Sequence, residues 1–249
     1  MKSRLDRVLV ERGLAPSREK AQALIMAGDV TVDGVKAQKP GQMTAESSRI
    51  EVLAAPPFVS RGGLKLNAAL DHFSIPVQSC VCLDVGASTG GFTDCLLQHG
   101  AARVHAVDVG AGQLDWKIRT DPRVVVHEKL NARYLRPEDI GEPVDLAVCD
   151  VSFISVTLIL PAVLPVLRTS GEDPSQRVTG EMVILVKPQF EVGRGQVGKG
   201  GIVREPELQQ AACRRVEQAA GQLGFTTAIM ESPILGAEGN REFLLYAHY

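Results

Sequence analysis

The chain has 249 residues, of which 45% are hydrophobic and 22% are charged. These shares are those of a folded globular protein, and the length suffices for one large domain or for a medium and a small one. The sequence has no run of about 18 uncharged apolar residues and no signal-peptide core at its start. We therefore expect a cytoplasmic protein that has no membrane partner.

Charge is divided unevenly along the chain, although the formal net charge is only −2. Residues 1–40 carry eight Lys and Arg against five Asp and Glu, which leaves the remainder acidic. A basic start on a slightly acidic body is typical of a small nucleic-acid-binding module joined to a larger domain. The five cysteines form no C-x-x-C pair, so we expect no metal site.

The first fifty residues predict two short helices and several short strands. One helix is expected over 3–12 with Ser3 as its N-cap, and a second over 17–28, between a serine N-cap and a glycine stop. Alternating valines around an Asp-Gly turn predict a hairpin over 30–35, and residues 50–52 form another alternating strand.

The order helix, helix, hairpin, with the string "AGDVTVDGVKAQKPG", resembles the S4 domain (alpha-L motif), a small RNA-binding module. The resemblance covers roughly residues 3–50. It implies that the basic side chains of the helix pair contact structured RNA, and these are Arg4, Arg7, Arg18 and Lys20. Contacts of this kind to phosphates give affinity without reading the base sequence.

A proline pair at 56–57 divides the chain, because proline interrupts both helix and sheet. We expect an RNA-binding domain over 1–55, a linker over 56–60 and a second domain over 61–249. In this second part apolar strands alternate with helical stretches, which predicts a doubly wound, Rossmann-like α/β fold with a mainly parallel sheet. Strands are expected near 81–85, 104–108, 146–150, 182–187, 227–231 and 243–248, and helices over 92–99, 155–167 and 206–222.

A glycine-rich turn follows the first of these strands and reads "DVGASTGGF". A strand that ends in an acidic residue, a tight turn and a helix start together form a site where the backbone approaches a ligand. The middle glycine of the dinucleotide fingerprint is missing, and the spacing resembles instead the first motif of class I methyltransferases. Asp108 ends the next strand and suits ribose hydroxyls. The residues predicted to bind the cofactor are Asp84, Gly86, Ser88, Gly90, Gly91, Phe92 and Asp108.

A second glycine-rich segment, residues 193–201, nearly spells a phosphate-binding loop but lacks the required Ser or Thr. We interpret it as a mobile loop that carries Arg194 and Lys199 and that becomes ordered when RNA binds.

Four charged residues stand in distinctive strings: Lys65 just after the linker in "SRGGLKL", Asp150 and Lys187 at strand ends in "VCDVSFISV" and "ILVKPQFE", and Glu242 at the start of the last strand in "GNREF". They match the Lys-Asp-Lys-Glu tetrad of FtsJ-like RNA 2'-O-methyltransferases, and the chain as a whole resembles the TlyA family. This resemblance implies S-adenosyl-L-methionine as cofactor, ribosomal RNA within a ribosomal subunit as partner, and methylation of a cytidine ribose as the reaction. Shorter members act on the large subunit alone, and from where it begins and ends the chain resembles these, although activity on the small subunit stays open.

The tetrad suggests a mechanism. Lys187 is the candidate for the general base or polarising group on the ribose 2'-hydroxyl, with Asp150 to orient it. Lys65 lends a second positive charge, and Glu242 holds Lys65 and the ribose. Two alternatives belong to other classes: a membrane-active haemolysin, as which the family was first described, and a non-catalytic ribosome assembly factor.

Overall fold

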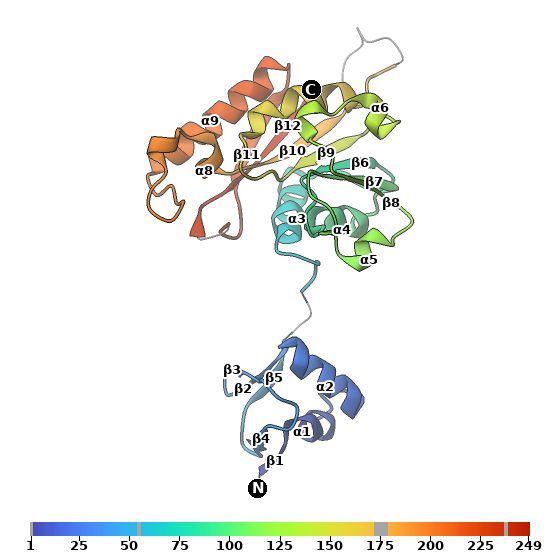
Figure 1. The fold of residues 1–249 in the computed structure, drawn as a ribbon, viewed down its shortest axis with the longest axis vertical. Coiled ribbons are helices and arrows are strands. Elements are labelled where there is room, and N and C mark those ends of the chain that lie inside the picture. Colours follow the sequence, from blue (N-terminus) through green and yellow to red (C-terminus); the bar gives the residue numbers. More distant parts are fainter. Residues whose placement is uncertain (1, 54–55, 172–178, 237–238) are drawn as a thin grey trace. The chain divides into compact units, whose positions relative to one another are not determined.

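In the computed structural model the chain forms two compact units, Met1–Pro56 and Pro57–Tyr249 (Figure 1). The structure describes residues 2–53, 56–171, 179–236 and 239–249. Each unit has a hydrophobic core of its own. Within the described residues, no helix combines the length and the apolar character that crossing a bilayer requires.

The N-terminal unit packs two helices on small sheets. Its core is built from apolar side chains of both helices and of the central strand, among them Leu5, Leu9, Ile25 and Val30. Strand β2 lies between β3 and β5, and β1 pairs with β4, all antiparallel. The elements are β1 (Lys2–Arg4), α1 (Leu5–Glu11), α2 (Arg18–Ala27), β2 (Val30–Val32), β3 (Val35–Lys36), β4 (Met43–Ala45) and β5 (Ile50–Val52).

The start of α1 differs from the prediction, and that of α2 agrees with it. Ser3 is not an N-cap: it lies in β1, opposite Thr44, and the helix begins at Leu5 without a side-chain cap. Backbone pairing with β4 decides this conformation, and the three residues of β4, Met-Thr-Ala within a mostly polar segment, gave no sign of a strand. In α2, the Ser17 hydroxyl accepts a hydrogen bond from the Lys20 backbone N–H (3.2 Å), and Gly28 ends the helix in the left-handed conformation, as predicted.

The C-terminal unit is a seven-stranded sheet covered by helices on both faces. Its elements are α3 (Gly62–Phe73), β6 (Val81–Val85), α4 (Gly91–Gln98), β7 (Arg103–Asp108), α5 (Trp116–Arg119), β8 (Val124–Glu128), η1 (Ala132–Tyr134), α6 (Pro137–Ile140), β9 (Leu146–Cys149), η2 (Val156–Leu158), α7 (Leu160–Val163), η3 (Leu164–Val166), β10 (Glu181–Val186), α8 (Pro188–Glu191), η4 (Arg194–Gln196), α9 (Pro206–Gln222), β11 (Thr226–Glu231) and β12 (Phe243–His248). The predicted doubly wound fold is confirmed.

The strand order is β11-β12-β10-β9-β6-β7-β8, and it determines where a ligand site can lie. Strands β6, β7, β8, β9 and β10 are parallel to one another, whereas β12 runs antiparallel between β10 and β11. The chain leaves β6 toward β7 on one side and later returns to β9 on the other. A crevice opens at such a switch point, beyond the carboxyl ends of the strands.

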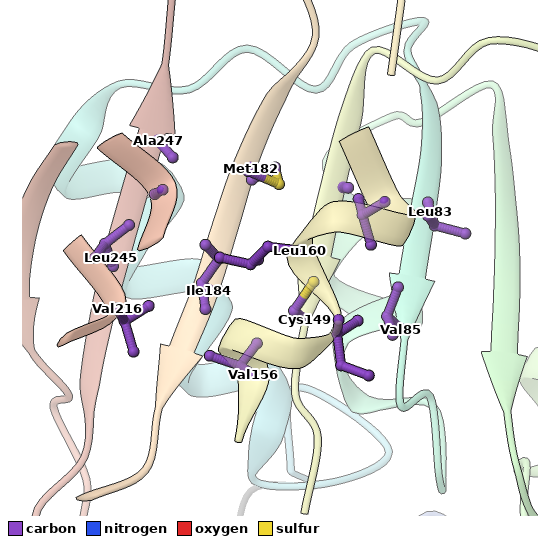
Figure 2. Close-up of a cluster of buried hydrophobic side chains, with 14 of the residues drawn as sticks. Leu83, Val85, Cys149, Val156, Leu160, Met182, Ile184, Val216, Leu245 and Ala247 are labelled. Carbon is purple, nitrogen blue, oxygen red and sulfur yellow. The ribbon is translucent and has the colours of Figure 1, made fainter. Parts of the chain in front are cut away.

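Alternate side chains along each strand fill two separate cores. On one face, Leu83, Cys149 and Ile184 pack beneath α7 and α9, together with Leu160 and Val216 from these helices (Figure 2). The opposite face packs against α3 and α4. Central strands that are buried on both faces are largely apolar, which is why the sequence shows β9 and β10 as hydrophobic runs.

The apolar helix predicted near 155–167 is not continuous. The structure breaks it into η2, α7 and η3, with Pro161 in the first turn of α7 and Pro165 in that of η3. Proline has no N–H to donate to the preceding turn. The segment still buries Val156, Leu160 and Val163 against the sheet.

Candidate active site

A cavity of about 730 Å³ lies at the switch point. All four charged residues singled out in the sequence line it: Lys65 from the first turns of α3, Asp150 directly after β9, Lys187 directly after β10, and Glu242 directly before β12. Because β12 is antiparallel, its start meets the ends of the parallel strands. A neighbouring hollow of about 330 Å³ shares part of the wall, including Asp150 and the glycine turn after β6.

The four charges form two close ion pairs. Lys65 Nζ lies 2.5 Å from Glu242 Oε2, and their side chains are only 9% and 3% exposed. Lys187 Nζ lies 2.5 Å from Asp150 Oδ1 and donates a hydrogen bond to the Ser152 hydroxyl (2.8 Å). Each ammonium therefore has its own carboxylate, which for the buried Lys65 offsets the cost of removal from water.

The turn after β6 brings backbone to the cavity wall. Gly86 has a φ of +85°, and a Cβ there would lie 2.3 Å from the carbonyl oxygen of Asp150. Gly91 begins α4, and a Cβ there would lie 2.1 Å from the Ser60 hydroxyl. These two glycines line the larger cavity together with Ser88 and Phe92. Gly90 lines neither cavity and packs against Leu114 and Ile118.

The two acidic strand ends have different surroundings. Asp108 lines the smaller hollow, and its carboxylate accepts hydrogen bonds from the backbone N–H groups of Ser88 (2.8 Å) and Gly110 (2.7 Å). Asp84 lines neither cavity: it is fully buried and accepts a hydrogen bond from the Thr93 hydroxyl (2.6 Å). Burial raises the pKa of Asp84 to about 7, and the charge of Asp150 adds to this shift.

Family models match both parts of the chain: the S4 domain matches residues 3–50, and the FtsJ-like methyltransferase matches residues 58–249. The chain belongs to the FtsJ-like methyltransferase family. It is thus an enzyme with an N-terminal S4 domain, and the predicted resemblance to the TlyA proteins is confirmed by the relatives below.

The similarity to known proteins covers most of this chain. The 16S/23S rRNA (cytidine-2'-O)-methyltransferase TlyA of Mycobacterium tuberculosis is 47% identical over 98% of this chain and 89% of its own. The 23S rRNA (cytidine-2'-O)-methyltransferase TlyA of Campylobacter jejuni is 35% identical over 76% of this chain and 70% of its own. A solved structure from Streptococcus thermophilus, provisionally titled a hemolysin, has a TM-score of 0.73 at 42% identity and covers 99% of this chain and 88% of that one.

The methyltransferase family implies the use of S-adenosyl-L-methionine, and the site fits such a ligand. The Oε1 atom of Gln189, on the cavity wall, is buried and has no hydrogen-bond partner among the described residues. An acceptor left in this state calls for a donor from a bound molecule. Gly86 and Gly91 let the chain pack closely at this wall, because a Cβ at Gly86 would meet the Asp150 carbonyl oxygen and one at Gly91 would meet the Ser60 hydroxyl.

The predicted RNA-binding residues of the S4 domain fall into two groups. Arg4 and Arg18 both bind the buried carboxylate of Asp6, with nitrogen–oxygen distances of 2.9 and 3.0 Å, while Arg7 and Lys20 are exposed. The two arginines hold the pKa of Asp6 well below its usual range, although its burial opposes this.

In the methyltransferase domain Lys199 is exposed, and the side chain of Arg194 lies outside the described residues. The segment that carries them is anchored by Asn240, whose side-chain amide donates to the Gly201 carbonyl (3.0 Å) and accepts from the Val203 N–H (3.1 Å). That this segment becomes ordered with RNA stays a prediction.

Several residues of the cavity wall were not predicted from the sequence. They are Ser60, Arg61, Ser152, Phe153, Gln189, Phe190 and Asn240. All lie in the strings that surround the tetrad, so their positions were marked, but no motif distinguished these side chains from their neighbours. Phe153 stands out because it is 93% exposed and has a φ of +65°, a conformation that costs a non-glycine residue energy.

Proposed function

We propose that this protein transfers a methyl group from S-adenosyl-L-methionine to the 2'-hydroxyl of a cytidine in ribosomal RNA. The observation that carries the proposal is the convergence of the Lys65–Glu242 and Lys187–Asp150 pairs on one cavity, beside the glycine turn. Two lysines that converge at a switch point suit an acceptor that is polar and must lose a proton. The names of the two TlyA relatives support cytidine ribose as the acceptor.

We assign the cofactor to the wall formed by Gly86, Ser88, Gly91, Phe92 and Asp108. The Asp108 carboxylate, already fixed by two backbone N–H groups, suits hydrogen bonding to ribose hydroxyls. Gln189 supplies a further acceptor. When bound, S-adenosyl-L-methionine supplies a methyl group on a positively charged sulfur, which leaves as a neutral thioether. Gly86 and Ser88 of the glycine turn would hold this molecule beside Asp150, with which they line both hollows.

Lys187 is proposed to act on the 2'-hydroxyl. Its Nζ is held between Asp150 and Ser152 at 2.5 and 2.8 Å, so it can be aimed at one further group. To act as the base, the Lys187 ammonium would first release a proton to solvent; Nζ could then accept the hydroxyl proton as the methyl group is transferred, which would restore the ammonium beside Asp150. Lys65, fixed by Glu242, holds the ribose in line with the methyl group. Such positioning is worth several orders of magnitude in rate.

The S4 domain is proposed to supply affinity for structured RNA through Arg4, Arg7, Arg18 and Lys20, and Arg194 and Lys199 would add contacts near the cavity. Lysine and arginine bind phosphates through charge and release counterions. A ribosomal substrate also implies that the enzyme works in the cytoplasm.

The deciding experiment is transfer of a tritiated methyl group to isolated small and large ribosomal subunits, followed by mapping of the modified nucleotide. We expect label at a cytidine 2'-oxygen of the large subunit, and label on the small subunit would extend the substrate range. Label on a base, or none on either subunit, would refute the proposal. A leakage assay on lipid vesicles with the same preparation tests the haemolysin alternative.

The variant Lys187→Ala tests the role that we assign to Lys187. Because Lys187 follows β10 and is not part of the wall that we assign to the cofactor, this variant is expected to bind S-adenosyl-L-methionine with little change, as measured by calorimetry, while methyl transfer is abolished. A Lys187→Ala enzyme that retained activity would remove this residue from the mechanism.

A further inference from the structure

A buried carboxylate outside the cavity connects the two segments that carry the Lys187–Asp150 pair. Glu191, at the end of α8, is 3% exposed and lines neither cavity. Its Oε2 accepts a hydrogen bond from the Ser155 hydroxyl (2.5 Å), and its Oε1 accepts one from the Val156 N–H (2.8 Å). Both donors belong to the segment that follows Asp150 along the chain.

We propose that Glu191 is a positioning residue for methyl transfer: it clamps the segment after β9 to the segment after β10, and so fixes Asp150 and Ser152 against Lys187. The inference rests on the proposed function of that pair. The same two segments also meet at the cavity through Lys187, whereas the clamp lies outside it.

The contacts on the cavity side show what the clamp has to hold. Lys187 reaches across to Asp150 and Ser152, and the rings of Phe153 and Phe190 lie with their centroids 5.4 Å apart. Of these five residues, Phe153 has the strained backbone. A strained loop keeps its conformation only where its surroundings impose it, and the bonds from Glu191 begin two residues further along.

Glu191 is itself fixed from a third element. Its backbone carbonyl accepts a hydrogen bond from Arg215 of α9 (2.9 Å), and this helix packs on the sheet. The Ser155 hydroxyl also contacts the Thr157 hydroxyl (2.7 Å). A rigid helix thus supports the carboxylate, and the carboxylate supports the active-site segment.

An amide can replace this carboxylate without loss of the bonds. The oxygen of a glutamine would accept from the Val156 N–H, and its NH₂ group would donate to the Ser155 hydroxyl. Burial raises the pKa of Glu191, so the site tolerates an uncharged group. Glu191→Gln should therefore retain the rate of methyl transfer that Glu191→Ala loses. If the role of Glu191 required its negative charge, Glu191→Gln would be as slow as Glu191→Ala.

The test compares Glu191→Ala, Glu191→Gln and Ser155→Ala with Glu207→Ala and Glu207→Gln. Glu207 is an exposed glutamate in the first turn of α9, outside the site. The kcat for methyl transfer is measured at saturating cofactor and ribosomal subunit, about 15 °C below the lowest melting temperature in the set. Displacing a positioned group by about 1 Å costs up to about a hundredfold in rate. We expect kcat to fall at least about tenfold in Glu191→Ala and severalfold in Ser155→Ala, and to stay within about threefold in Glu191→Gln and in both controls.

Two further measurements keep the outcomes distinct. Affinity for S-adenosylhomocysteine is measured by calorimetry, so that a loss of cofactor binding is not mistaken for a loss of positioning. Hydrogen exchange of peptides over residues 150–157 is compared with exchange over β6. We expect faster exchange in the first region alone for Glu191→Ala and Ser155→Ala, and wild-type exchange for Glu191→Gln.

A merely structural role predicts a lower melting temperature with unchanged kcat in the folded enzyme, and that result would overturn the proposal. So would a Glu191→Gln variant as slow as Glu191→Ala. If Glu191→Ala does not fold, the other two variants still test the proposal. Ser155→Ala should then have a lowered kcat, whereas Glu191→Gln should not. A wild-type enzyme that methylates no subunit refutes the proposed function instead, and the hydrogen-exchange comparison, which needs no RNA, then decides on the clamp.

Discussion

The Lys65–Glu242 pair allows a quantitative test, because each partner is buried and each has the other within 2.5 Å. Removing Glu242 alone, as in Glu242→Leu, leaves the Lys65 ammonium without a counter-ion. The usual cost of breaking a buried pair in this way is about 3–5 kcal/mol. Lys65 lines a cavity that water can enter, so we expect about 3 kcal/mol, and a similar cost for Lys65→Met.

The double variant Lys65→Met with Glu242→Leu removes both charges together. Replacing a buried ion pair by apolar groups of similar volume is often close to neutral. We therefore expect the double variant to be destabilised by much less than the sum of the two single costs, about 6 kcal/mol, with a coupling energy of at least about 3 kcal/mol. The Arg136–Asp139 pair, whose arginine is 69% exposed, serves as the control cycle, and no coupling beyond experimental error is expected there.

The chain itself provides a probe for this measurement. All five cysteines lie in the C-terminal unit, and Cys82, Cys95 and Cys149 are fully buried. Their reaction with a thiol reagent across a urea titration follows the unfolding of this unit without interference from the S4 domain. The coupling would be refuted if the destabilisation of the double variant equalled the sum of the two single destabilisations within about 0.5 kcal/mol.

Three further predictions concern single positions. Gly86→Ala should weaken S-adenosyl-L-methionine binding at least about tenfold, because its Cβ meets a backbone carbonyl, whereas Gly112→Ala shares a positive φ but meets no atom within 4 Å and should bind normally in calorimetry. Because the pKa of Asp84 is raised to about 7, its contribution to the free energy of unfolding is complete below pH 4 and is lost as the pH rises to 7. The free energy of unfolding of Asp84→Asn should therefore rise relative to that of the wild type over this range, by up to about 1.4 kcal/mol per pH unit. Parallel stability curves for the two proteins would contradict the shift. Asp6→Ala removes the shared acceptor of two arginines, so it should lower both the melting temperature of the S4 domain and its affinity for ribosomal RNA fragments in a filter-binding assay, and unchanged affinity would show that the arginines need no such support.

The extent to which the sequence predicts the fold depends on how local the decisive interactions are. Helix α9 and strand β12 are found at the predicted bounds, since the amphipathic period and the apolar run are complete within each segment. The pairing of β1 with β4 was missed because it joins residues some forty positions apart that have no strand-like composition. Helix α3 was also not predicted, because two glycines open it and glycine is a poor helix former.

The same distinction holds for the site. Charged residues at strand ends are visible in the sequence, and the topology of a doubly wound sheet brings such ends together. Partners set by packing are not visible. Nothing in the sequence indicated that Asp84 faces Thr93 rather than the cavity, or that Arg4 and Arg18 converge on Asp6.

The antiparallel direction of β12 has a practical consequence for how the enzyme is handled. Phe243 pairs with Val186 at the edge that bears the cavity, and Ala247 pairs with Met182 toward the opposite edge. The last strand thus delivers Glu242 to the site and then carries the chain away from it. A fluorescent label or affinity tag attached after Tyr249 would therefore emerge on the side remote from the cofactor, which makes this end the better point for immobilising the enzyme in binding assays with whole ribosomal subunits.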